Sequence, residues 1–196
     1  MASTGTHRDP DARRRAILEA AAQLIREGDL GSLTHRKVAA RAEIPLGSTT
    51  YYFASLADLK AKALEVLATE IEDDLAVFEE ELLAHGATAE VIAGQLHRYL
   101  NDDDRVRTET ALYVAGFENS ELAALGRRWF DGLVRVLAIH VGPDTATAMA
   151  VFTDGAALHA VLHEQPLPLA LIEQTARNLM ASGPAANPPQ QLGNSR

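Results

Sequence analysis

The sequence of 196 residues contains no cysteine. It can therefore form neither a disulfide framework nor a thiolate metal site, a composition typical of cytoplasmic proteins. It also lacks any uninterrupted apolar run of about 18 residues, the length that a membrane-spanning helix needs. Residues 1–9 lack the apolar stretch of a secretory signal peptide. We therefore expect a cytoplasmic protein with no membrane partner.

Strand patterns bounded by hairpin turns are missing as well, so we expect an all-α fold. Proline and glycine separate segments whose apolar residues recur at helical spacing. The longest segment begins with the capping-box pattern Ser55–Asp58 and ends at His85-Gly86. The expected helices cover residues 10–28, a second segment from 32 or 34, the stretch between 45 and 53, and then 55–85, 90–100, 103–116, 121–141, 144–164 and 169–181.

An excess of positive charge is also absent, since the formal net charge is −9. Taken alone, this charge argues against a nucleic-acid binder. However, residues 1–60 hold nine Arg/Lys against seven Asp/Glu, whereas the remainder holds nine against twenty. Any surface that faces phosphates is therefore expected in the first third of the chain.

The segment Leu33–Phe53 has the features of a helix-turn-helix, with two short helices around a tight turn at 42–45. Small or branched apolar residues, such as Val38 and Ala39, suit close packing of the two helices. The second helix is expected to expose small and hydroxyl-bearing groups that approach base edges and phosphates in the major groove. The candidate DNA-binding residues are Thr34, His35, Arg36, Lys37, Gly47, Ser48, Thr49, Thr50, Tyr51 and Tyr52.

A core role is the alternative for the aromatic residues that end this segment. Phe53 is assigned to packing against the first helix. For Thr49–Tyr52 we favour contact with DNA, and Arg13–Arg15 is expected to be mainly a solvated face.

Residues 10–60 resemble the DNA-binding domain of the TetR (tetracycline-repressor-like) family of bacterial regulators. One position departs from this pattern, because family members often carry a phosphate-binding lysine directly after the serine that caps the fourth helix. Leu56 stands there in this chain, and Lys60 or Lys62, about one turn further on, is a candidate replacement. The resemblance rests on Leu33-Thr34, Val38-Ala39, the segment Ile44–Phe53, Ser55 and Asp58-Leu59.

The resemblance implies a ligand-responsive repressor with a small-molecule cavity in its C-terminal helices. Such cavities combine apolar and aromatic walls with a few polar groups. The candidate ligand-binding residues are Arg105, Thr108, Glu109, Leu112, Tyr113, Phe117, Trp129, Leu133 and Phe152.

A small helical enzyme or metal-binding bundle is the alternative hypothesis. His159 and His163 lie four residues apart, a spacing that can bind zinc, but two histidines leave a tetrahedral site half built. No nucleophile–base pair, phosphate loop or complete ligand set accompanies them. We therefore expect neither catalysis nor a cofactor nor a metal.

The segment Asp144–Val161 is apolar or small on nearly every side, which indicates burial on two faces. Burial within a monomer is the alternative to a subunit interface. The resemblance implies a homodimer through the last two helices, bound to a palindromic operator in double-stranded DNA. The expected organisation is a flexible N-terminus (1–9), a helix-turn-helix DNA-binding domain (10–54), a ligand-binding and dimerisation domain (55–182) and a disordered tail (183–196).

Overall fold

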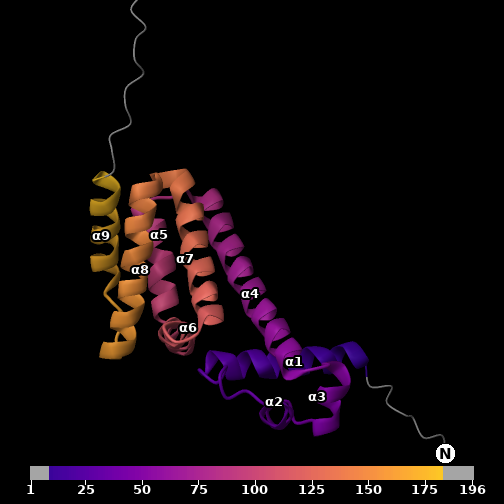
Figure 1. Ribbon diagram of the computed structural model, residues 1–196. Coiled ribbons are helices and arrows are strands. Elements are labelled where there is room, and N and C mark those ends of the chain that lie inside the picture. Colours follow the sequence, from indigo (N-terminus) through magenta and orange to yellow (C-terminus); the bar gives the residue numbers. More distant parts are fainter. Residues whose placement is uncertain (1–8, 183–196) are drawn as a thin grey trace, which may run out of the picture. The chain divides into compact units, whose positions relative to one another are not determined.

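The computed structural model describes residues 9–182, apart from the side chains of residues 104, 108, 112 and 115. Within this part of the chain there are nine α-helices and no strand (Figure 1), which confirms the all-α prediction. The expectations for residues 1–8 and 183–196 lie outside the described residues. The helices are α1 (Pro10–Arg26), α2 (His35–Arg41), α3 (Leu46–Tyr52), α4 (Leu56–His85), α5 (Ala89–Leu100), α6 (Asp103–Gly116), α7 (Ser120–Val141), α8 (Pro143–His163) and α9 (Leu169–Ala181).

The helix ends follow local capping chemistry. Asp9 accepts a hydrogen bond from the backbone N–H of Asp11 (3.0 Å), directly before Pro10 in the first turn of α1. The Ser55 hydroxyl accepts one from the N–H of Asp58 (3.0 Å), as the capping-box pattern predicts. Gly86 follows α4 with a φ of +80°, a left-handed conformation that glycine adopts without strain.

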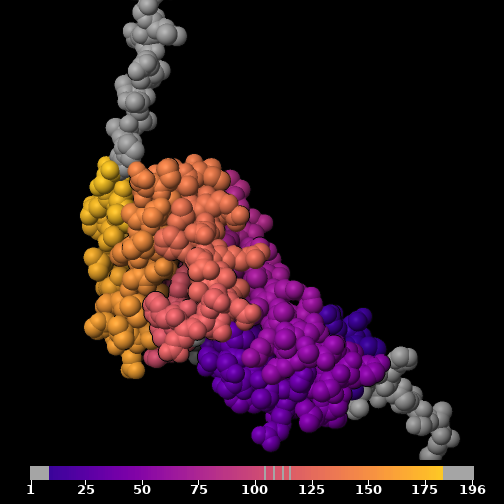
Figure 2. Space-filling model, viewed as in Figure 1, coloured from indigo at the N-terminus to yellow at the C-terminus, as the bar shows by residue number. Residues whose placement is uncertain are grey.

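The chain forms two compact units. The first comprises the described residues up to Val77 together with Asp102–Asp131. Its core is built by the apolar face of α1, with Ile17 and Ile25 fully buried, against Val38, Phe53 and Leu59. The space-filling view shows the atoms of α1 to α3, in indigo and purple, packed closely together (Figure 2). This packing fixes α2 and α3 on α1.

The second unit comprises Phe78–Asn101 and the described residues from Gly132 onward. Helices α5, α8 and α9 pack together in it (Figure 1), with Leu100 and Ile172 buried. Arg177 of α9 also pairs with Glu90 of α5 at 2.8 Å. Among the described residues, α8 alone is long and apolar enough to cross a membrane. Core helices of soluble proteins meet the same criterion. Of the most apolar 18 residues of α8, 39% are buried inside the protein.

Candidate DNA-binding surface and ligand cavity

A helix-turn-helix is formed by α2 and α3, both of which lie in the first unit. The Thr34 hydroxyl caps α2 by accepting a hydrogen bond from the N–H of Lys37 at 3.2 Å. In the turn, the N–H of Ile44 donates to the carbonyl of Ala39 at 3.0 Å. Glu43 adopts a left-handed φ of +53°, which turns the chain sharply before α3. Helix α2 packs on both α1 and α3.

The outer face of α3 offers small and aromatic groups to solvent. Gly47 and Thr50 are exposed, and Tyr51 is 81% exposed. The Tyr51 and Tyr52 rings meet edge to face, with centroids 5.1 Å apart. An aromatic side chain this exposed contributes little to the core, so Tyr51 is available to a partner.

Thr49 does not belong to that outer face, and the expectation that it is exposed was wrong. Its side chain is fully buried, and its hydroxyl donates to the carbonyl of Leu46 at 2.8 Å. Thr49 precedes Phe53 by four positions, so both side chains point toward the core of the first unit. Phe53 is 2% exposed, as expected of a core residue.

The cations of the helix-turn-helix differ in their partners. Lys37 binds the carboxylate of Asp29 at 3.0 Å and the hydroxyl of Ser32 at 2.7 Å. Asp29 also accepts a hydrogen bond from the Ser32 hydroxyl at 2.7 Å. The hydrogen bonds from Ser32 and Lys37 lower the pKa of Asp29, the one from Ser32 most strongly. Within the described part of the chain, exposed Arg36 has no ion-pair partner. Arg36 is therefore more readily available to a phosphate than Lys37.

Leu56 has a structural role at the position where family members often carry lysine. It packs against the core cluster of the first unit. Of the two candidate replacements, Lys62 forms an ion pair with Glu65 at 2.9 Å. Lys60 is half-buried and has no ion pair among the described residues.

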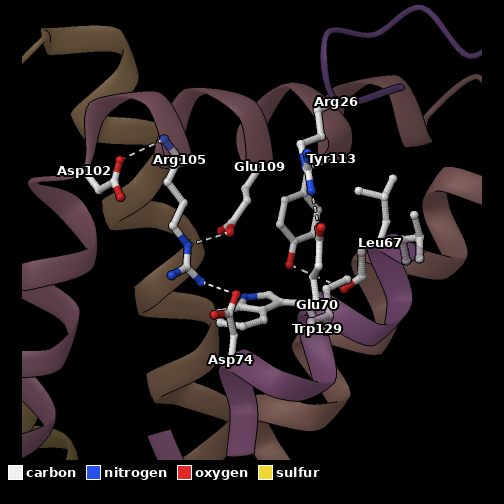
Figure 3. Close-up of a pocket in the computed structure, with 12 residues that line it drawn as sticks. Arg26, Leu67, Glu70, Asp74, Asp102, Arg105, Glu109, Tyr113 and Trp129 are labelled. Atoms are coloured by element: carbon white, nitrogen blue, oxygen red, sulfur yellow. Dashed lines mark hydrogen bonds and ion pairs between the residues drawn. The ribbon is translucent and has the colours of Figure 1, made fainter. Parts of the chain in front are cut away.

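A cavity of about 390 Å³ lies in the first unit, between α1, α4, α6 and α7. Four carboxylate side chains and two guanidinium groups line it, together with a phenol and an indole (Figure 3). Such a combination of aromatic, aliphatic and convergent polar groups is typical of small-molecule sites. The lining residues are Arg26, Leu67, Glu70, Ile71, Asp74, Asp102, Arg105, Glu109, Tyr113, Leu125, Gly126 and Trp129.

Ion pairs organise the polar side of the cavity. The Arg105 guanidinium donates to Asp74 at 2.6 Å and to Glu109 at 2.9 Å (Figure 3). Arg26 pairs with Glu70 on the opposite part of the wall. Tyr113 lies close to the backbone of α7, with its hydroxyl 3.4 Å from the carbonyl oxygen of Gly126. Since carboxylates outnumber guanidinium groups, the lining carries a formal excess of negative charge.

Four of the nine predicted ligand-binding residues line this cavity: Arg105, Glu109, Tyr113 and Trp129. The side chains of Thr108 and Leu112 lie outside the described residues. Phe117 does not line it and is 88% exposed. Leu133 and Phe152 belong to the second unit.

The sequence prediction missed the contribution of α1 and α4. Glu70 and Asp74 alternate with Leu67 and Ile71 on one face of α4, a spacing at which carboxylates share a surface with core residues. This alternation of carboxylates and apolar residues is the sequence pattern from which the contribution of α4 could have been predicted. Arg26, in the last turn of α1, had none because its place in the wall depends on contacts distant in sequence.

The two histidines considered as metal ligands stack on each other, with ring centroids 4.2 Å apart. The Nδ1 atom of His159 is buried and has no hydrogen-bond partner in the described structure. Among residues 9–182, no group of three or more His, Asp or Glu side chains is placed to hold a metal ion.

Together, the exposed α3 and the packing of α1 to α3 define a helix-turn-helix DNA-binding protein. No family model matches the sequence, and no curated protein matches it. Solved structures do match. A member of the TetR family from Streptomyces coelicolor A3, SCO1917, is 31% identical, covers 85% of this chain and 97% of its own, and superposes with a TM-score of 0.69.

The multidrug binding protein EbrR in its complex with proflavin is also 31% identical, over 85% of this chain and 99% of its own, with a TM-score of 0.64. A TetR transcription regulator from Haloarcula marismortui shares the fold at 15% identity and a TM-score of 0.64, over 88% of this chain and 98% of its own. The chain belongs to the TetR family of transcriptional regulators. It is a ligand-responsive DNA-binding regulator and not an enzyme.

Proposed function

We propose that this regulator is a repressor that leaves its operator when a cationic aromatic molecule occupies the cavity of the first unit. The proposal depends most on one observation: four carboxylates surround a cavity that also presents Tyr113 and Trp129. Carboxylates attract a cation through charge, and aromatic faces attract it through their quadrupoles. A flat organic cation satisfies both groups at once.

The ligands bound by EbrR support this ligand class. That protein is described in complexes with proflavin, ethidium and malachite green. All three are organic cations with extended aromatic rings. A likeness of about 30% identity over most of both chains makes the same chemical class the first choice for this cavity.

Contact with DNA is assigned to α3 and to the start of α2. Exposed Tyr51 and Thr50 lie on the outer face of α3. Arg36, nearby in sequence, offers a positive charge that has no ion pair within the described part of the chain. Thr49 is left out because it is buried. The proposed contacts are Thr34, His35, Arg36, Lys37, Gly47, Ser48, Thr50, Tyr51, Tyr52 and Lys60.

We assign DNA binding to residues 10–54, and ligand binding and dimerisation to residues 55–182. Apolar side chains on α8 and α9 remain exposed in the single chain, including Val151 (59%), Leu162 (69%) and Leu171 (50%). A homodimer through these helices would cover them and present two copies of α3 to a palindromic operator. The cytoplasm is the proposed location, where the chromosome is accessible.

Ethidium fluorescence tests the ligand class on the full-length protein without DNA. We expect saturable binding that weakens as salt is raised, because screening reduces the attraction between cation and carboxylates. A neutral polycyclic hydrocarbon of similar size should bind more weakly. Equal affinity for the two compounds, or no binding of ethidium, would overturn the proposed ligand class.

A further inference from the structure

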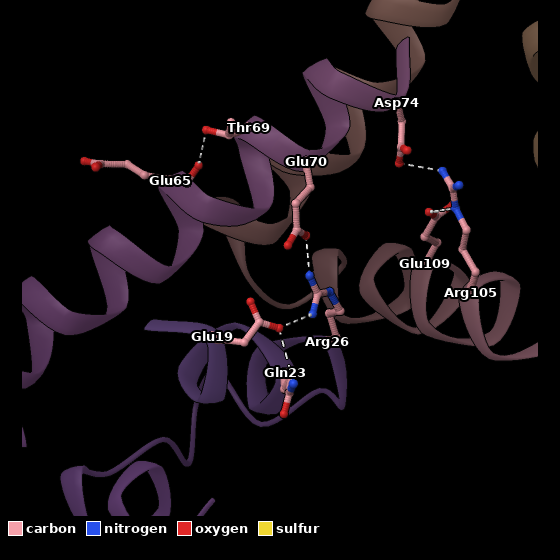
Figure 4. A network of polar contacts seen from close by, with 9 residues as sticks. All are labelled: Glu19, Gln23, Arg26, Glu65, Thr69, Glu70, Asp74, Arg105 and Glu109. Carbon is pink, nitrogen blue, oxygen red and sulfur yellow. Dashed lines mark hydrogen bonds and ion pairs between the residues drawn. The ribbon is translucent and has the colours of Figure 1, made fainter. Parts of the chain in front are cut away.

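Arg26 belongs both to the wall of the cavity and to the first helix of the helix-turn-helix unit. It occupies the last position of α1, and its guanidinium pairs with Glu70 of α4 and lies 3.8 Å from Glu19 (Figure 4). Its side chain is only 25% exposed, so solvent screens the pair with Glu70 incompletely. One side chain thus links a carboxylate of the cavity to α1.

The next residue, Glu27, connects the end of α1 to the DNA-binding helices. Glu27 is the C-cap residue of α1 and accepts two hydrogen bonds from the guanidinium of Arg41, at 2.8 and 2.7 Å. These bonds lower the pKa of Glu27 and raise that of Arg41. Arg41 is the last residue of α2, directly before the turn that leads into α3. The last residue of α1 and its C-cap residue therefore contact α4 and α2, respectively.

We propose that Arg26 is the counter-ion of Glu70 when no ligand is bound, and that a cationic ligand displaces Arg26 from Glu70. This inference rests on the cationic ligand class proposed above. A bound cation and Arg26 compete for one carboxylate, since each gains most from direct contact with it. When Arg26 leaves Glu70, the end of α1 loses this ion pair with α4, and the Glu27–Arg41 pair transmits that change to α2 and the turn before α3.

Thermodynamic reciprocity predicts how substitutions in the Arg26–Glu70 pair change the affinity for the ligand. If the ligand breaks the Arg26–Glu70 pair, then the pair must weaken ligand binding by the same factor. Removing Arg26 should therefore tighten binding of the cation while reducing its effect on DNA. Removing the charge of Glu70 should weaken binding of the cation. A purely structural role of the pair predicts the same sign for both substitutions, because either one damages the same contact.

The test compares Arg26→Met and Glu70→Gln with wild type and with the matched control Arg128→Met. Arg128 pairs with Glu72, also on α4, but neither residue lines the cavity. The DNA is a duplex selected from a random library by the purified wild-type protein. Ethidium affinity is measured by fluorescence without DNA, operator affinity by anisotropy without ligand, and thermal unfolding confirms that each variant is folded.

We expect Arg26→Met to bind ethidium roughly three- to fivefold more tightly, the upper range for a partly exposed ion pair. Glu70→Gln should bind it more weakly. Both variants should bind the selected duplex more weakly than wild type without any ligand, whereas Arg128→Met should match wild type in both assays.

The two proposals can fail separately. If wild type does not bind ethidium but both variants lose affinity for the duplex, the ligand class is wrong. The connection from Glu70 through the end of α1 to α2 is then still supported. Suppose instead that wild type binds ethidium, but Arg26→Met does not raise the affinity for ethidium or does not change the affinity for the duplex. The displacement of Arg26 is then refuted, whereas the ligand class is still supported. Equal effects from Arg128→Met would also refute it.

Discussion

The most informative single substitution in the cavity is Asp74→Asn, which removes one negative charge and almost no volume. Asp74 lies on α4 and faces Arg105, which also binds Glu109. The substitution leaves the ion pair between Arg105 and Glu109 in place and lowers the negative excess of the lining. We predict weaker binding of a monovalent aromatic cation such as ethidium, with little change in the fold.

The magnitude follows from the distance and exposure of the charge. Two unit charges about 4 Å apart interact by about 4 kcal/mol at an effective dielectric constant of about 20, and by about 1 kcal/mol in water. The Asp74 side chain is 41% exposed, which places its contribution toward the lower figure, roughly 1–2 kcal/mol. Since 1.4 kcal/mol corresponds to about tenfold in Kd, we expect a loss of roughly five- to thirtyfold.

Fluorescence titration of ethidium at low and high salt measures this loss. The difference between wild type and Asp74→Asn should shrink at high salt, because screening acts on the charge that the substitution removed. Glu72→Gln is the matched control, since Glu72 lies on α4 outside the cavity. Unchanged affinity in Asp74→Asn, or an equal loss in Glu72→Gln, would refute the electrostatic argument.

Three further predictions concern stability. Phe53→Ala should lower the free energy of unfolding in urea by about 3–5 kcal/mol, because Phe53 is 2% exposed in the core of the first unit; a loss below about 1 kcal/mol would contradict that placement. Gly126→Ala would place a Cβ 3.0 Å from the Tyr113 ring. This crowding should lower the free energy of unfolding by about 1–3 kcal/mol and weaken ethidium binding. A wild-type free energy of unfolding together with a wild-type ethidium affinity would rule out the crowding. Hydrogen bonds lower the pKa of Glu90 from 4.5 to about 2, the one from Arg177 most strongly. Ionised Glu90 therefore stabilises the fold above pH 4.5, and this contribution fades as the pH falls toward 2. Urea melts of Glu90→Gln should approach wild type over that interval, and a constant difference would contradict the pairing.

The helical fold was predictable because its signals are local. Asp9-Pro10, Thr34 and Ser55 cap helices where the sequence indicates. Helix α8 begins one residue earlier than expected, at Pro143, because the proline occupies the first turn after Gly142.

The site was predictable only in part. Arg105, Glu109 and Tyr113 share one face of α6, so their polar and aromatic character on a single helix already marked them as candidates. Asp74 looked like an ordinary solvated carboxylate of a long amphipathic helix, since nothing local reveals its partner 31 positions away. Thr49 was misplaced because in a helix of seven residues a hydroxyl gives no sign of which face it occupies.

The central claim is that a cation in the cavity releases the protein from DNA. It is tested most directly by the anisotropy of the selected duplex, bound by wild type or by Asp74→Asn, as malachite green is added. We predict release from wild type, and release from Asp74→Asn only at a roughly five- to thirtyfold higher dye concentration, the same factor as its loss of affinity. Identical release curves would show that release does not depend on the charge of Asp74 in the cavity, and no release from wild type would show that the cavity does not respond to this class of ligand. Either result would contradict the account.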